Sequence, residues 1–141
     1  MLTLSSSEVR RDWSRVLDSA VREKPVFIKR TRDYMMLCST DMVSQLVNGL
    51  HIVADRFDES DGSVTLSAAA LDIVSNGPDL PSAKAALASD IMEYAEEYYH
   101  EFELYSRAPN RKAHLPYVIK ALTAKSEKEL EDAVICQSGK S

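Results

Sequence analysis

Serines and arginines are concentrated near the start of the chain in an arrangement that suits contact with a phosphate backbone. Ser5, Ser6 and Ser7 precede the adjacent arginines Arg10 and Arg11. Serine hydroxyls and the free amides of a helix N-terminus bind phosphate oxygens, and arginine contacts phosphates or guanine edges. This segment therefore predicts an interface with DNA.

Three more cations extend this basic surface further along the chain. The full predicted set of DNA-binding residues is Ser5, Ser6, Ser7, Arg10, Arg11, Lys29, Arg30 and Arg32. The alternative is that each is an ordinary surface charge, and the nearby carboxylates Glu8 and Asp12 favour that interpretation. We interpret Arg15 and Arg22 as plain solvated helix charges.

Two groups in the second half of the sequence suggest other chemistry. Glu97 and His100 form one Glu-x-x-His pair, whereas carboxylate-bridged di-iron sites need two such pairs and two further glutamates. We therefore expect a solvated acidic face, with no metal and no cofactor. A second group leaves open a phosphate or RNA site, although an intramolecular partner for the acidic helix is the favoured interpretation. It consists of Arg107, Arg111, Lys112 and His114.

The remaining candidates point to packing and not to catalysis. Tyr94, Tyr98 and Tyr99 fit core packing first and a protein-binding hot spot second. The sequence has no glycine-rich phosphate loop, no zinc-ligand spacing and no recognisable pair of nucleophile and base. We therefore expect that the protein is not an enzyme.

The elements that position the first group have clear local signals. Ser5 and Glu8 form a capping box, and an apolar stripe runs from Val9 through Trp13, Val16, Leu17, Ala20 and Val21. This pattern predicts one amphipathic helix to about residue 23, which Pro25 ends. A short first strand at residues 1–4, a hairpin at 26–39 and a second helix at 40–47 complete a β-α-β-β-α order.

A unit of about fifty residues buries little apolar surface and is only marginally stable as a monomer. We therefore expect it to dimerise. A symmetric dimer also suits two-fold operator DNA.

The second half of the sequence predicts strands followed by a long helix. Strands are expected near residues 51–57, 63–67 and 71–74, before a break at Asn76-Gly77-Pro78. The stripe of the long helix is Leu80, Ala83, Leu87, Ile91, Ala95, Tyr98 and Phe102. A polar loop at 106–115, a short helix from Pro116, a last helix from Ser126 through Val134 and a frayed tail at 137–141 should follow.

Composition and charge limit the classes of protein that remain. The hydrophobic content of 45% and charged content of 28% are ordinary for a folded protein, and no apolar run approaches the ~20 residues of a membrane span. The N-terminus does not resemble a signal peptide. We expect a cytoplasmic protein, with no membrane partner, in which Cys38 and Cys136 are reduced.

The two halves differ in charge, which suits two different partners. Residues 1–50 carry eight Lys and Arg against six acidic residues, a charge of +2, whereas residues 51–141 carry nine against sixteen, a charge of -7. One partner of such a protein is expected to be anionic.

Several segments of residues 1–50 together resemble the Phd/YefM (prevent-host-death) antitoxins. Ser7-Glu8-Val9-Arg10 resembles their Ser-Glu-Ala-Arg opening, and residues 11–18 resemble the following Asn-Phe-Ser-Glu-Leu-Leu-Asp segment. Residues 24–30 resemble their Gly-Pro-Val-Ile-Ile-Thr-Arg strand, and Thr40-Asp41-Met42 takes the place of the Leu-Glu-Asp-Tyr helix start. The family hairpin usually carries glycine, which is missing here from residues 31–36. The resemblance implies a homodimer that binds its own promoter and sequesters a toxin encoded beside it.

Residues 51–105 carry a looser resemblance to the β-β-helix of HicB-type antitoxins, which favours a folded second module. The sequence thus predicts an α+β fold with two domains: a Phd/YefM-like DNA-binding and dimerisation domain at 1–50 and a toxin-binding α+β domain at 51–141. The predicted function is a type II antitoxin that binds its cognate toxin and represses its own operon by binding operator DNA. The alternative is a Phd-like dimeric scaffold that does not bind DNA.

Overall fold

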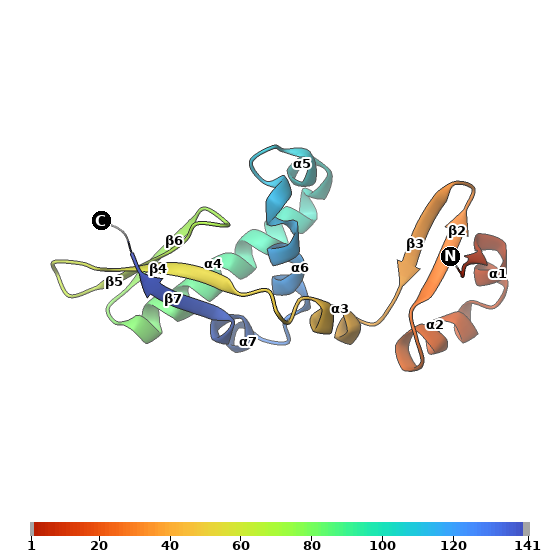
Figure 1. The fold of residues 1–141 in the computed structure, drawn as a ribbon, viewed down its shortest axis with the longest axis horizontal. Helices are drawn as coiled ribbons and strands as arrows, with labels where there is room; N and C mark the ends of the chain where they lie inside the picture. The colour runs from red at the N-terminus through yellow and green to blue at the C-terminus, as the bar shows by residue number, and fades with distance from the viewer. Residues whose placement is uncertain (1, 140–141) are drawn as a thin grey trace. The chain divides into compact units, whose positions relative to one another are not determined.

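A computed structural model describes residues 2–139 and confirms the α+β class (Figure 1). The chain forms two compact units, Met1–Gln45 and Leu46–Ser141, called here the N-terminal and the C-terminal unit. No helix among the described residues is long and apolar enough to cross a bilayer.

The N-terminal unit consists of a small sheet and short helices. Its elements are β1 (Leu4–Ser5), α1 (Ser6–Arg11), α2 (Trp13–Arg22), β2 (Val26–Arg30), β3 (Asp33–Leu37) and α3 (Thr40–Leu46), the last of which ends just past the unit boundary. The strand order is β1-β2-β3, with β1 parallel and β3 antiparallel to β2.

The predicted first helix is in fact two helices, because the backbone leaves the helical region at Asp12 (φ -114°, ψ 39°). Aspartate disfavours helix interiors, since its short side chain competes for local hydrogen bonds. Here the Asp12 carboxylate pairs with Arg15 instead of capping α2. The sequence prediction of one continuous helix was wrong at this residue.

The core of the N-terminal unit is smaller than the sequence predicts. Its buried members among the described residues are Val9, Val16, Ala20, Val26 and Ile28. The predicted stripe also included Trp13, Leu17 and Val21, but these side chains are 49%, 36% and 65% exposed. These three positions and those of Val16 and Ala20 belong to one apolar stripe of α2, but only Val16 and Ala20 are covered by the rest of this small unit.

The C-terminal unit is a four-stranded sheet with helices on one face (Figure 1). Its elements are β4 (Ile52–Asp58), β5 (Val64–Ala68), β6 (Ile73–Gly77), α4 (Leu80–His100), α5 (Phe102–Arg107), the 3-10 helix η1 (Lys112–His114), α6 (Leu115–Thr123), α7 (Glu127–Asp132) and β7 (Val134–Ser138). The strand order is β6-β5-β4-β7, antiparallel except for the parallel pair β4–β7.

Helix α4 packs across this sheet and forms the larger core. Leu87, Ile91 and Tyr98 of α4 are at most 1% exposed, and Ile52 and Leu66 face them from the sheet. The helix approaches β6 so closely that a Cβ on Gly77 would lie 2.5 Å from a backbone nitrogen of α4. Gly77 is therefore required for the packing of α4.

Three sequence predictions for the C-terminal unit were wrong. The last helix ends at Asp132, and Val134–Ser138 form strand β7 instead of a helix end and a frayed tail. Helix α4 ends at His100, so Phe102 belongs to α5 and is 39% exposed. The predicted loop at 106–115 contains the end of α5 and η1. Residues 140 and 141 of the predicted tail lie outside the described residues.

The turn of the β2–β3 hairpin contains a strained residue, Thr31, whose effect on stability can be tested. Thr31 has a φ of 56°, a left-handed conformation that is costly for a β-branched residue. We expect Thr31→Gly to stabilise the N-terminal unit by about 1 kcal/mol, because the relief of strain exceeds the entropic cost of glycine. Urea unfolding followed by the fluorescence of Trp13, the single tryptophan, measures this change.

Thr31→Ala is the matched control. Alanine retains a Cβ, so this substitution should increase the stability of the unit less than Thr31→Gly does. A lower unfolding midpoint for Thr31→Gly would contradict the assignment of strain to this turn.

Candidate functional site

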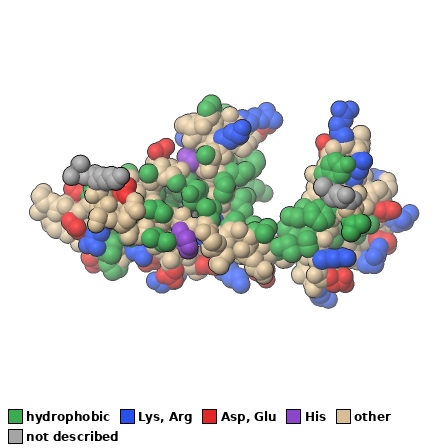
Figure 2. Space-filling model, in the orientation of Figure 1, with side chains coloured by type: hydrophobic (Ala, Val, Ile, Leu, Met, Phe, Trp, Pro, Cys, Tyr) green, Lys and Arg blue, Asp and Glu red, His purple; other side chains and the backbone are tan. Residues whose placement is uncertain are grey.

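The predicted DNA-binding residues lie on neighbouring elements of the N-terminal unit. Strands β1 and β2 pair so that Ser5 lies opposite Lys29, which places the start of α1 beside the end of β2. Arg30 ends β2, and Arg32 lies in the turn that follows. Figure 2 shows lysine and arginine side chains at the hairpin end of this unit.

The start of α1 has the capping box that the sequence predicts. The Ser5 hydroxyl accepts a hydrogen bond from the Glu8 amide (3.2 Å), and the Glu8 carboxylate accepts one from the Ser5 amide (3.0 Å). Ser5 and one helix amide are thus already engaged, and a carboxylate lies in the first turn of this six-residue helix. Binding of a phosphate here would depend on Ser6, Ser7 and the neighbouring cations.

Those cations are exposed and free of ion pairs within the described chain. They are Arg10, Arg11, Lys29, Arg30 and Arg32. Lys29 lies over the ring of Tyr34, 5.5 Å from its centroid, whereas Arg15 is bound to Asp12 at 3.0 Å. Side chains that are exposed and make no ion pair can neutralise phosphate charge without breaking a salt bridge.

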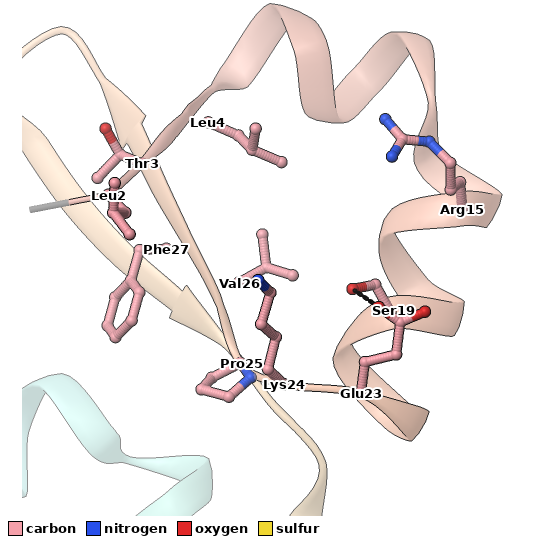
Figure 3. A pocket seen from close by; sticks show the side chains of 10 residues that line it. All are labelled: Leu2, Thr3, Leu4, Arg15, Ser19, Glu23, Lys24, Pro25, Val26 and Phe27. Atoms are coloured by element: carbon pink, nitrogen blue, oxygen red, sulfur yellow. Dashed lines mark hydrogen bonds between the residues drawn. The ribbon is translucent and has the colours of Figure 1, made fainter.

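The same unit has an open groove of about 760 Å³ that the sequence did not predict (Figure 3). The groove lies between the β1–β2 pair and α2, and its apolar floor includes Leu4, Val26 and Phe27. Arg15 and Glu23 lie on its α2 side. Its lining comes from three segments of the chain, so only the fold brings these residues together.

In the C-terminal unit, two tyrosine rings flank the guanidinium of Arg111, and a third tyrosine packs against both rings. The guanidinium carbon lies 4.1 Å from the ring centroid of Tyr105 and 5.7 Å from that of Tyr94. Tyr98 packs edge-on against both rings, and its hydroxyl donates to the Arg111 carbonyl (3.1 Å). We call Tyr94, Tyr98, Tyr105 and Arg111 the tyrosine–arginine cluster.

The cluster assigns different roles to the predicted tyrosines. Burial raises the pKa of Tyr94 and of Tyr98 above the ordinary value, as expected for hydroxyls in the core. Tyr105 donates to Glu97 (2.8 Å), and this hydrogen bond raises the pKa of Tyr105. Tyr99, also predicted to pack in the core, is instead 62% exposed.

The four basic residues of segment 107–114 do not form one surface. Arg111 is stacked in the cluster, Arg107 pairs with Glu103 (3.2 Å), and His114 is buried with its Nδ1 2.6 Å from the Tyr94 hydroxyl. Burial lowers the pKa of His114 and favours the neutral imidazole. This division of roles does not favour the phosphate or RNA site that the sequence left open.

No group of three or more metal-ligating side chains occurs among residues 2–139. The Glu97 carboxylate of the Glu-x-x-His pair is hydrogen-bonded to Tyr105.

Comparison with known proteins identifies the family. The chain belongs to the PHD_like family, described as "Antitoxin of toxin-antitoxin, RelE / RelB, TA system", whose model matches residues 1–136. It is similar to a crystal structure described as an antitoxin from Syntrophomonas wolfei subsp. wolfei, with 32% identity and a TM-score of 0.93. That match covers 98% of this chain and 99% of the other. No curated protein matches, and neither finding supports the HicB-like resemblance.

The burial of His114 predicts how stability depends on pH. The folded-state pKa lies below the unfolded value of about 6.5, so below that pH the unfolded state binds more protons. The stability that neutral His114 contributes is therefore fully present above the unfolded pKa and is lost as the pH falls below that value. We expect the urea midpoint, followed by near-UV circular dichroism of the tyrosines, to fall between pH 7.5 and pH 5.5.

His114→Gln should show a smaller pH effect, whereas His100→Gln, which changes an exposed histidine, should retain the wild-type effect. An equal pH effect in all three proteins would contradict the assignment to His114.

Proposed function

We propose that this antitoxin neutralises its toxin by direct binding through residues 51–141 and represses its own operon through residues 1–50. The single observation that carries this proposal is membership of an antitoxin family across residues 1–136, which spans both units. In this proposal the protein is a cytoplasmic, non-enzymatic repressor of the Phd/YefM kind.

The N-terminal unit supports the proposed homodimer by what it leaves exposed. Trp13, Leu17 and Val21 recur every four residues along α2 and form an apolar stripe outside the core. The apolar groove beside α2 adds further surface that a partner could cover. A second copy would bury this surface and compensate for the small core.

Operator binding is supported by the unpaired cations of the same unit. A dimer would present two copies of the set related by a two-fold axis, which suits the half-sites of palindromic DNA. Binding would depend steeply on salt, because each neutralised phosphate releases counterions.

Toxin binding is assigned to the C-terminal unit because of its charge. Residues 51–141 carry a charge of -7 and suit a basic toxin. A toxin that acts on RNA or the ribosome would need a basic surface, which an acidic unit would complement.

One observation favours the second candidate, a Phd-like dimeric scaffold without DNA binding. The Glu8 carboxylate lies at the start of α1, within the proposed DNA interface, and would repel a phosphate there. In this alternative the N-terminal unit would serve only to dimerise the chain.

Substitution of the α1 arginines separates these two candidates. We expect Arg10→Ala with Arg11→Ala to weaken binding to the protein's own promoter about tenfold or more. The log–log salt slope should become less negative by about 0.9 for each phosphate contact removed. Fluorescence anisotropy of a labelled promoter duplex over a salt series measures both quantities.

Arg15→Ala is the matched control, since Arg15 is already paired with Asp12. Equal affinity of the unmodified protein for promoter and scrambled duplexes would favour the scaffold.

The α2 stripe provides a test of dimerisation. We expect Leu17→Glu to convert the dimer to a monomer at micromolar concentration, because it places a charge in the middle of the proposed interface. Sedimentation velocity measures the change. Val74→Glu, which alters an exposed apolar residue of the C-terminal unit, should leave the dimer intact. A Leu17→Glu protein that remained dimeric would contradict this interface.

A further inference from the structure

We infer that the junction of α4 and α5 is the surface that docks the toxin, and that it takes a basic protein face with an apolar centre. This inference rests on the proposed function. The α4–α5 surface, as we define it, consists of the apolar residues Tyr99, Phe102 and Leu104 and the carboxylates Glu93, Glu96 and Glu101.

The first observation is the exposure of large apolar side chains where α4 ends. Tyr99, Phe102 and Leu104 lie within six residues and are 62%, 39% and 64% exposed. None of the three is among the side chains that form the core of the described chain or pack against it as partly buried residues. Aromatic residues are enriched at the centres of protein interfaces and carry much of their binding energy.

The second observation is the negative charge of the segment that contains them. Segment 90–107 carries six carboxylates against one arginine, a charge of -5. Arg107 pairs with Glu103, and Glu97 accepts a hydrogen bond from Tyr105. Glu93, Glu96 and Glu101 are exposed and make no ion pair within residues 2–139. They can therefore form a charged rim for an incoming basic partner.

The third observation is that Phe102 and the α4–α5 junction are held in place before any partner binds. The Phe102 ring packs edge-on against buried Tyr98, with 5.7 Å between centroids. The tyrosine–arginine cluster ties α4 to α5 and to the segment before η1. A surface fixed in this way loses little conformational entropy on binding, which favours affinity.

Charge also decides between the candidate occupants. A second copy of this chain, docked by two-fold symmetry, would bring the same carboxylates face to face and would be repelled. Nucleic acid is disfavoured for the same reason. A basic protein surface would pair with the carboxylates of the rim and cover the apolar centre. Under the proposed function, that partner is the toxin.

The test uses the full chain and the toxin purified from the neighbouring reading frame, with binding measured by surface plasmon resonance over a salt series. We expect Tyr99→Ala with Leu104→Ala to raise the Kd about tenfold or more, mainly through faster dissociation. Glu93→Lys with Glu96→Lys should slow association and reduce its salt dependence. Both variants change exposed side chains, so melting curves should match the unmodified protein.

Two matched controls come from elsewhere in the same unit. Val74→Ala removes an exposed apolar side chain on β6, and Glu59→Lys reverses an exposed charge in the β4–β5 turn. Each should change the Kd by less than about twofold.

The possible outcomes test the docking surface separately from the proposed antitoxin function. Tight binding that neither α4–α5 variant weakens would overturn the docking surface and leave the antitoxin proposal intact. No binding by the unmodified protein would overturn both. Loss of self-association in the Tyr99 and Leu104 variant, with toxin binding unchanged, would show instead that the surface joins two copies of this chain.

Discussion

The N-terminal unit buries little of its apolar surface, and the proposed dimer and operator interface depend on that constraint. Its buried core within the described residues has five members, none larger than isoleucine, and a core of that size stabilises a domain only marginally. Trp13, Leu17 and Val21 of α2 remain exposed outside this core. We propose that a second copy covers them, and the two-fold symmetry of such a dimer would present the unpaired cations twice, as palindromic operator DNA requires.

The C-terminal unit differs from the N-terminal unit in the size of its buried core. Its sheet and helices α4, α6 and α7 enclose sixteen buried apolar residues among those described, so it needs no partner to complete its core. With a core of this size, the unit can leave apolar residues exposed at the α4–α5 junction and remain folded. The stacking of Arg111 on Tyr105 keeps that junction ordered. Arg111 therefore contributes to structure, although its neighbours Arg107 and Lys112 in the sequence suggested a basic surface. The negative charge that remains is suited to a basic partner.

Local signals in the sequence predicted local structure well, and missed what depends on distant residues. The capping box of Ser5 and Glu8, the long helix after Asp79 and the hairpin strands follow from nearby residues and were predicted. Strand β7 was mistaken for a helix end, because its stabilising partner β4 lies about eighty residues earlier. The exposure of Tyr99 and the stacking of Arg111 could not be predicted either, since both depend on where α4 ends and α5 turns.

The central claim is that two tasks belong to separate parts of one chain. The most direct measurement is growth rescue from the toxin by Arg10→Ala with Arg11→Ala, assayed beside a reporter driven by the protein's own promoter. The account predicts that this variant rescues growth as fully as the unmodified chain while the reporter is derepressed. A variant that lost rescue although it was folded and equally abundant would contradict the division, because the α1 arginines would then be needed for toxin binding.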